Sequence, residues 1–122
     1  MVHAAIGGMQ LKRWSGYFRI IWPTLKVLNA AKRAPGCLHA ETFKDGHVFF
    51  AVSVWQTQTQ MQDFARTGLH GRLTAMAMTE MKLFYNHSRY FNDIPTRRQS
   101  VAAWKAAIAA RNGKGTVGRY TP

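Results

Sequence analysis

The chain has 122 residues, 47% of them hydrophobic and 12% aromatic, which suits one folded domain with its own core and excludes a disordered segment. A single cysteine, Cys37, excludes an internal disulfide and a cysteine-based metal site. No apolar run is long enough to span a membrane and no secretion signal is evident, so we expect a cytoplasmic protein without a membrane partner.

The charge is strongly positive: 17 Lys and Arg against five Asp and Glu give a formal net charge of +12. These cations are spread along the chain, with only Lys12-Arg13, Lys32-Arg33 and Arg97-Arg98 as adjacent pairs. No recognisable nucleic-acid-binding motif accompanies them. We therefore predict a solvated basic surface and no nucleic-acid partner. Attraction of an anionic ligand or of nucleic acid is the alternative.

The N-terminal part predicts a strand followed by a helix. Met9 and Leu11 belong to the strand, which Gly7-Gly8 weakens at its beginning. Ser15 is a candidate N-cap for a helix that continues to about Ala34. Pro23 predicts a kink or a second start within it. The apolar positions of this helix recur every three or four residues: Phe18, Ile21, Trp22, Leu25, Leu28 and Ala31.

A β-hairpin follows. Asp45-Gly46 is a favoured two-residue turn, which predicts that Lys44 pairs with His47. Counting outward places three further pairs: Glu41 opposite Phe50, His39 opposite Val52 and Cys37 opposite Val54. Phe43 and Val48 share the face of these residues. The other face carries Leu38, Ala40, Thr42, Phe49, Ala51, Ser53 and Trp55. Both faces are largely apolar, so we expect both to be covered.

The C-terminal half predicts a helix, a strand and a last helix. Thr57 or Thr59 caps the first of these helices, and its inward stripe is Met61, Phe64 and Ala65. Gly68 interrupts it before Leu69-His70. Residues 81–91 form a strand, and a helix spans about Ser100 to Arg111. We expect residues 1–112 to be one domain and 113–122 to be a flexible basic tail.

The order β-α-β-β-α-β with an extra C-terminal helix predicts an α+β, ferredoxin-like split β-α-β fold with a four-stranded antiparallel sheet. Helices cover one face of such a sheet. Two sheets packed face to face in a dimeric α+β barrel would cover the other, so we expect a homodimer.

Seven side chains are candidates for a ligand site. His70 follows a helix break, where a neutral imidazole could accept a proton or ligate heme iron; the alternative is a histidine that packs the break. Trp55 could form an aromatic wall, or serve as a core anchor. The histidines lack metal-ligand spacing, so we expect no metal site. The remaining candidates are Phe49, His39, Glu41, Tyr85 and Arg89.

His39 and Glu41 share a strand face among apolar neighbours, which could make Glu41 a base of raised pKa. Alternatively, Glu41 pairs with an arginine of a second subunit. Arg89 lies on one face of the last strand with Tyr85 and His87. That face could bind an anionic or phenolic ligand through the two donors of Arg89, or be structural.

The segment VFFAVSVWQT, followed by Met61, Phe64 and ARTGLHGR, resembles the antibiotic-biosynthesis-monooxygenase-like group of the dimeric α+β barrel superfamily. Val52-Ser53-Val54-Trp55 and Gly68-Leu69-His70 carry most of this resemblance. It implies a small dimer with a pocket between sheet and helices. Members include cofactor-free oxygenases of quinol-like aromatics and heme-degrading monooxygenases. The heme-degrading members place a Trp in the second helix, where this chain has Phe64.

The resemblance implies a cofactor-independent monooxygenase acting on a small aromatic or quinol-like substrate. His70 would accept a proton, Arg89 or Tyr85 would orient the substrate, and Trp55 and Phe49 would be walls. We expect no cofactor. One alternative function is a non-enzymatic dimer that binds a ligand or heme, and another is a basic protein associated with nucleic acid.

Overall fold

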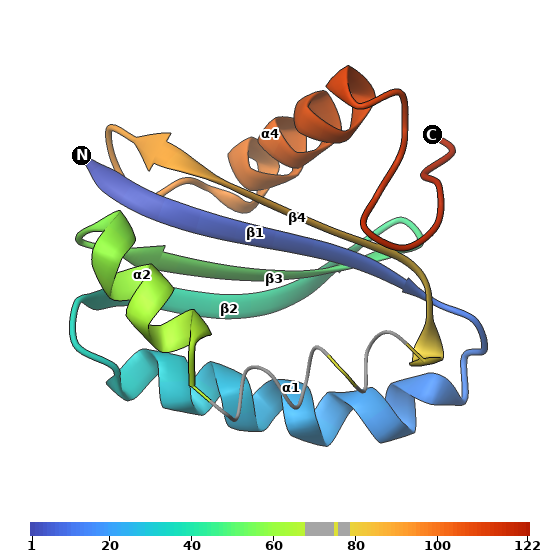
Figure 1. Ribbon diagram of the computed structural model, residues 1–122, viewed down its shortest axis with the longest axis horizontal. Helices are drawn as coiled ribbons and strands as arrows, with labels where there is room; N and C mark the ends of the chain where they lie inside the picture. Colours follow the sequence, from blue (N-terminus) through green and yellow to red (C-terminus); the bar gives the residue numbers. More distant parts are fainter. Residues whose placement is uncertain (68–74, 76–78) are drawn as a thin grey trace.

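The computed structural model describes residues 1–67, 75 and 79–122. In this part of the chain four strands and the helices α1, α2 and α4 follow the predicted order (Figure 1). The strands are β1 (Val2–Leu11), β2 (Cys37–Asp45), β3 (Val48–Trp55) and β4 (Met81–Phe91). The helices are α1 (Gly16–Arg33), α2 (Gln58–Ala65) and α4 (Arg97–Ala110).

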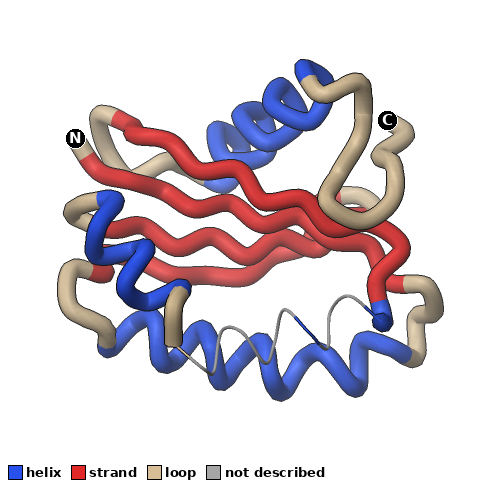
Figure 2. The backbone as a smooth tube through the Cα atoms, viewed as in Figure 1, coloured by secondary structure: helices blue, strands red, loops and turns tan. Residues whose placement is uncertain are grey.

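The four strands form one antiparallel sheet in the order β2-β3-β1-β4. α1 and α2 lie on one face of this sheet and α4 lies on the other (Figure 2). The α+β, ferredoxin-like fold and its extra C-terminal helix are therefore confirmed. None of the described helices is long and apolar enough to cross a membrane.

α1 is one unbroken helix that contains Pro23, so the predicted second start does not occur. Ser15 occupies the N-cap position, but its hydroxyl makes no capping hydrogen bond. The buried side of α1 is formed by Ile20, Thr24 and Ala31. The periodicity groups Phe18, Ile21 and Trp22 with Ala31, but these three side chains are exposed to solvent.

β2 and β3 form the predicted hairpin, but the residues that pair across it differ from the predicted ones. Asp45 pairs with Val48 and Glu41 with Val52, a shift of two residues from the predicted pairing. The turn residues are thus Gly46 and His47. Gly46 has a φ of +59°, while His47 does not have a positive φ, the pattern of a type II′ turn rather than type I′. Because a shift of two keeps the alternation, the predicted faces survive from His39 onward. At the start of β2 a bulge pairs Cys37 with Trp55 instead of Val54, so Cys37 lies on the opposite face from the one predicted.

The face under α4 is packed around Trp104, which is fully buried. Its ring meets Phe50 edge-on at 5.2 Å, and its indole nitrogen donates to the Tyr85 carbonyl at 2.9 Å. Gly8 lies beneath this ring, where a Cβ atom would collide with it. The core cluster on this face is Ala4, Ile6, Val48, Phe50, Val52, Val54, Leu83, Tyr85, Trp104 and Ile108.

A helix of the same chain therefore covers the sheet face that we expected a second sheet to cover. α4 presents Trp104 and Ile108, both fully buried, to this face. The apolar face by itself is consequently no evidence for a partner, and the homodimer stays a prediction. The segment 113–122, predicted as a flexible tail, folds back on the molecule, since Tyr120 meets Trp104 at 5.1 Å and Val117 bridges to Phe84.

α2 and α4 both have side-chain caps at their first turns. The Thr57 hydroxyl accepts from the Gln60 amide at 3.2 Å, which selects Thr57 from the two predicted caps of α2. Thr96 and Gln99 form a reciprocal capping box at the start of α4. These caps fix where α2 and α4 begin on their respective faces of the sheet.

Candidate functional site

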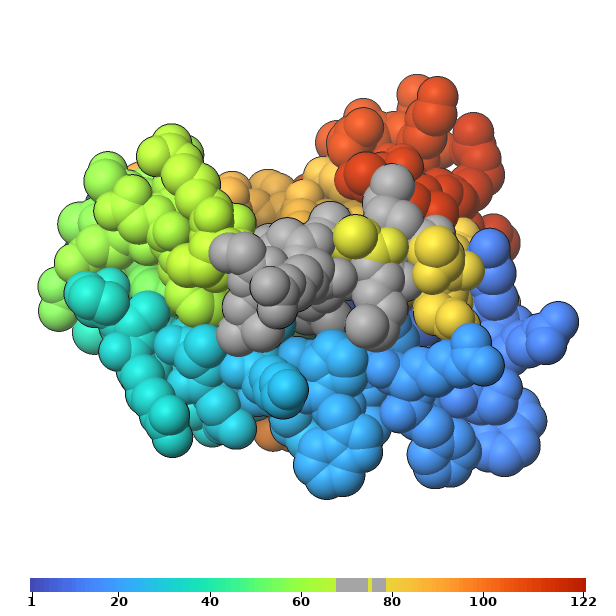
Figure 3. Space-filling model, turned by 60° about the horizontal axis from the view of Figure 1, so that its bottom comes forward, coloured from blue at the N-terminus to red at the C-terminus, as the bar shows by residue number. Residues whose placement is uncertain are grey.

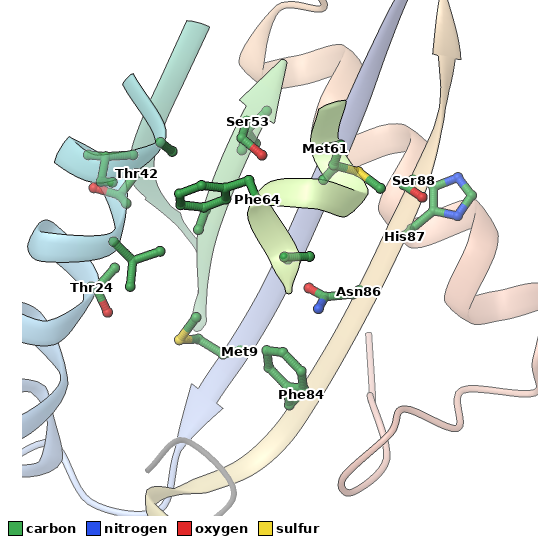
Figure 4. A pocket seen from close by; sticks show the side chains of 18 of the residues that line it. Met9, Thr24, Thr42, Ser53, Met61, Phe64, Phe84, Asn86, His87 and Ser88 are labelled. Carbon is green, nitrogen blue, oxygen red and sulfur yellow. The ribbon is translucent and has the colours of Figure 1, made fainter. Parts of the chain in front are cut away.

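A cavity of about 250 Å³ lies between the sheet and the helices α1 and α2 (Figure 4). Its lining is predominantly apolar, with a few hydroxyl and amide groups. α1 contributes Thr24, Val27, Leu28 and Ala31, and α2 contributes Met61, Phe64 and Ala65. The sheet contributes Ala5, Gly7, Met9, Thr42, Ala51, Val52, Ser53, Trp55, Met81, Phe84, Asn86, His87 and Ser88.

Small side chains at the centre of the sheet create this space. Gly7 of β1 pairs with Ala51 of β3, which pairs in turn with Thr42 of β2. One step along, Ala5 pairs with Ser53. Because neighbouring residues on one face of a sheet stand side by side, these positions form a continuous shallow floor. Larger side chains on the same strands would reach α1 and fill the gap.

One end of the cavity is closed by Trp55, which is fully buried at the end of β3. Its indole nitrogen donates to the Ser53 hydroxyl at 2.9 Å, so the ring is held in one orientation. The Phe64 ring of α2 lies 5.3 Å from it. Met61 belongs to the same cluster. The predicted inward stripe of α2 therefore faces this cavity and is confirmed.

Thr24 and Asn86 are two of the polar side chains that line the cavity, together with Thr42, Ser53 and Ser88. The Thr24 hydroxyl of α1 is buried and has no hydrogen-bond partner. The Asn86 side chain extends from β4 on the cavity side, beside Phe84 (Figure 4). It crosses in front of Gly7, where a Cβ atom would lie 2.6 Å from the Asn86 Oδ1 atom. A buried hydroxyl without a partner costs free energy that a ligand oxygen could recover.

Charged groups are scarce at this site. Among the described lining residues, His87 alone has a titratable side chain, and it projects from the side of β4 opposite Asn86 (Figure 4). Burial, and secondarily the nearby Arg89 guanidinium, lower the pKa of His87 from 6.5. The described part of the cavity is thus a neutral environment, suited to an uncharged ligand.

Only some of the predicted site residues lie at the cavity. Trp55 lies in the cavity wall, as expected. Phe49 does not line the cavity but packs in a neighbouring cluster, with the Tyr17 ring 6.3 Å away. His70, the predicted proton acceptor, lies outside the described residues.

The other four candidates lie on the α4 face and cannot contact a ligand in this cavity. Tyr85 is buried against Trp104. The Arg89 guanidinium is stacked on Phe91, 4.4 Å from the ring centroid. Alternation along β4 is the physical reason, because it sends these side chains away from Asn86.

His39 and Glu41 form a separate ionic group on the α4 face. The His39 Nε2 atom is 3.6 Å from Glu41, and the Arg97 Nε atom donates to Glu41 at 3.1 Å. An arginine partner for Glu41 was one of the alternatives, and the structure supplies it from α4 of the same chain. Glu41 therefore pairs with Arg97 on this face, away from the cavity under α1 and α2.

The sequence reasoning missed the floor and the polar groups of the cavity: Gly7, Ala51, Thr24 and Asn86. A signal for the floor was present, since Ala5 and Gly7 alternate on β1 and Ala51 and Ser53 alternate on β3. Its meaning depends on cross-strand register, which places the small residues side by side. Among the described residues, no group of three His, Cys, Asp or Glu side chains could hold a metal ion.

No protein-family model and no curated protein matches the sequence. Solved structures do match the fold. Rv0793 from Mycobacterium tuberculosis gives a TM-score of 0.69 at 8% identity, over 79% of this chain and 100% of that chain. A protein described as an antibiotic biosynthesis monooxygenase gives 0.64 at 13% identity, over 78% and 100%.

A variant of SnoaB, a cofactor-independent oxygenase from Streptomyces nogalater, gives a TM-score of 0.65 at 6% identity, over 76% of this chain and 95% of that chain. The fold shared with antibiotic-biosynthesis-monooxygenase-like proteins is therefore confirmed. At such identities the likeness concerns the fold, and the chemistry must be argued from the site.

Proposed function

We propose that this chain, which shares the fold of antibiotic-biosynthesis-monooxygenase-like proteins, binds a small aromatic or quinol-like molecule in the cavity and oxygenates it with O₂. The observation that carries the proposal is the cavity itself: about 250 Å³, with a small-residue floor, the Trp55 ring at one end and few polar groups. Ligand sites in proteins combine an apolar lining with a few placed polar groups in this way. The volume is slightly below their usual range of about 300–1,000 Å³, which favours a ligand of one or two fused rings.

The polar groups suggest how such a molecule would be oriented. A phenolic oxygen could accept a hydrogen bond from the unpartnered Thr24 hydroxyl or from the Asn86 amide. The ring would then lie over Ala51 and Gly7, with Trp55 at its edge. This orientation replaces the role first given to Arg89 and Tyr85, whose side chains lie on the other face of the sheet.

The reaction needs one base and no cofactor. A base removes a phenolic proton, and the resulting electron-rich anion transfers an electron to O₂. The two radicals combine in a C–O bond, and the protonated base returns its proton to the resulting peroxide anion. The hydroperoxide then loses water, so one oxygen atom stays on the ring and the other leaves as water. No external reductant is consumed. We assign the base to His70, as the resemblance implies, because the described cavity wall directs no titratable side chain inward.

The test uses 1,4-dihydroxynaphthalene and isotopically labelled O₂. The proposed reaction yields a hydroxynaphthoquinone that carries one labelled oxygen, together with water. Spontaneous oxidation yields the parent quinone and hydrogen peroxide instead, so mass spectrometry separates catalysis from background. His70→Ala should lower kcat about 100-fold or more, the usual contribution of a general base. Tyr85→Phe is the matched control and should leave turnover unchanged, since Tyr85 packs under α4.

Turnover that survives His70→Ala unchanged would contradict the role of His70, and loss of turnover in Tyr85→Phe would contradict the location of the site. Binding without any labelled product would favour the non-enzymatic ligand-binding alternative. A Soret band on hemin titration that His70→Ala removes would favour heme binding.

A further inference from the structure

The outer side of α1 carries large apolar side chains that the fold leaves in solvent. Trp14, just before the helix, is 76% exposed, Phe18 is 70% exposed and Trp22 is 71% exposed. Ile21 is 45% exposed beside them. Within α1 these residues are separated by three or four positions, so they form one continuous strip, which we call the aromatic strip: Trp14, Phe18, Ile21 and Trp22. Figure 3 shows α1 along the whole lower edge of this face of the molecule.

The strip has no packing role in the described fold. The buried side of α1 is a different one, formed by Ile20, Thr24 and Ala31 against the sheet. Within the strip, the Trp14 and Phe18 rings contact each other edge-on at 6.0 Å. Single exposed apolar residues are ordinary, but a contiguous patch of them marks a surface that binds something. α1 is thus apolar on two sides, and the described residues pack against only one of them.

A row of cations runs beside the aromatic strip. Arg19, Lys26 and Arg33 are spaced by seven residues, two helical turns, so they project in nearly the same direction. All three are exposed. The chain has no acidic residue before Glu41, so α1 itself has none. Arg19 contacts Glu80 at 3.2 Å, while its side chain remains 76% exposed.

We propose that α1 binds the surface of an anionic phospholipid membrane, with the aromatic strip inserted at the headgroup level and the cation row against lipid phosphates. Trp and Phe on one side of a helix with Lys and Arg beside them characterise helices that lie in a membrane interface. The expectation of no membrane partner considered only segments that span the bilayer, and a helix lying on the surface needs no such segment.

Two other occupants fit the surface less well. A second copy of the chain would bring together two bodies of charge +12, both with their cations beside the contact. Single-stranded nucleic acid would suit the cations and the rings, since bases stack on aromatic side chains. It offers nothing to Ile21, however, whereas an acyl chain does. An anionic lipid surface complements the aromatic, aliphatic and cationic parts together.

The direct test measures binding to vesicles of phosphatidylcholine alone and of phosphatidylcholine mixed with phosphatidylglycerol. The chain's own tryptophans report insertion: Trp14 and Trp22 are exposed, whereas Trp55 and Trp104 are already fully buried. We expect the protein to sediment with the anionic vesicles, with a blue shift of tryptophan fluorescence, and to be released as salt rises. Neutral vesicles should bind it far more weakly.

Variants separate insertion from simple charge attraction. Trp22→Ser should weaken binding about 10-fold, because a large apolar side chain no longer leaves water. Ile94→Ser is its control, since Ile94 is 44% exposed outside the strip. Lys26→Glu should weaken binding about 10-fold. Arg98→Glu changes the net charge by the same amount at an exposed position of α4, and it should change binding less than about 2-fold. All four positions are on the surface, and circular dichroism confirms that each variant is folded.

Several results would overturn the proposal. Equal binding to neutral and anionic vesicles would do so, as would anionic binding that Trp22→Ser leaves intact, since the strip would then not insert. A concentration-dependent dimer that Trp22→Ser dissociates would assign the strip to a second copy. Binding to single-stranded DNA that Trp22→Ser abolishes, without vesicle binding, would assign it to nucleic acid.

Discussion

The sheet face under α4 and the sheet face under α1 and α2 differ in the size of the side chains at their centres. Under α4, Phe50, Leu83 and Ile6 pack around the fully buried Trp104. Under α1 and α2, Gly7, Ala51 and their small neighbours leave a cavity of about 250 Å³. The centre of the first face is therefore filled by large side chains, whereas the centre of the second face is open enough to hold the proposed ligand.

Truncating the centre of each face should show the largest difference between them. Trp104→Ala removes a ring in contact with Phe50 and Tyr85 and leaves a closed void, so it should cost about 3–5 kcal/mol of unfolding free energy. Met61→Ala, at the half-buried cavity wall, should cost about 1 kcal/mol or less. Urea denaturation measures both. Equal losses would mean that the cavity face is packed as tightly as the α4 face.

Gly7 and Gly8 of β1 allow a sharper comparison, because a Cβ atom added at each would lie on opposite faces of the sheet. A Cβ at Gly8 would meet the ring of Trp104, which is held on all sides, so Gly8→Ala should cost about 1–3 kcal/mol. A Cβ at Gly7 would meet the end of the Asn86 side chain, which can rotate away, so Gly7→Ala should be nearly neutral in stability. Thermal unfolding of the two variants decides this, and the reverse order would contradict the assignment of faces.

A smaller effect concerns His3, at the α2 end of the sheet. It is buried, its ring lies 4.6 Å from Tyr90, and its Nδ1 atom has no hydrogen-bond partner. Burial lowers the pKa of His3 below the value of 6.5 that it has in the unfolded chain. Between these two values the unfolded chain binds a proton that the folded chain does not. The stability that His3 contributes is therefore complete above pH 6.5 and is lost as the pH falls from 6.5 through the folded pKa.

The measurement is unfolding free energy against pH for the wild type and for His3→Phe, which keeps a ring beside Tyr90. His3→Phe should flatten the acid slope by at most about 1.4 kcal/mol per pH unit, the limit for one proton. His47→Gln, in the exposed hairpin turn, is the control. If the two variants flatten the slope equally, the burial of His3 is not its cause.

The fold was predictable because alternation and capping are local signals. The hairpin, the faces of its residues and the helix cap at Thr57 follow from short stretches of sequence. The predicted register is wrong because the two turn residues are Gly46 and His47, not Asp45 and Gly46, and of these only Gly46 has a positive φ. A register error of two residues keeps the alternation, so every predicted face except that of Cys37, at the bulge, is correct and the predicted architecture holds.

The candidate site was less predictable because it depends on relations between distant residues. Trp55 was identified from its place at a strand end, but the cavity beside it exists because Gly7 and Ala51 are aligned across two strands. The choice of face depended on α4, since Trp104 fills the side that carries Tyr85 and Glu41. The exposure of Trp22 likewise could not be predicted, because helical periodicity does not say which of two apolar sides of α1 faces the sheet.

The central claim is that the small-residue floor forms a ligand cavity, and filling that cavity tests it most directly. Calorimetric titration with 2-naphthol should show one site per chain in the wild type, and Ala51→Leu should weaken binding at least about 10-fold while the protein stays as stable or gains about 0.5–2 kcal/mol. Ala106→Leu, on the exposed side of α4, should bind as the wild type does. Undiminished binding by a folded Ala51→Leu variant would contradict the account.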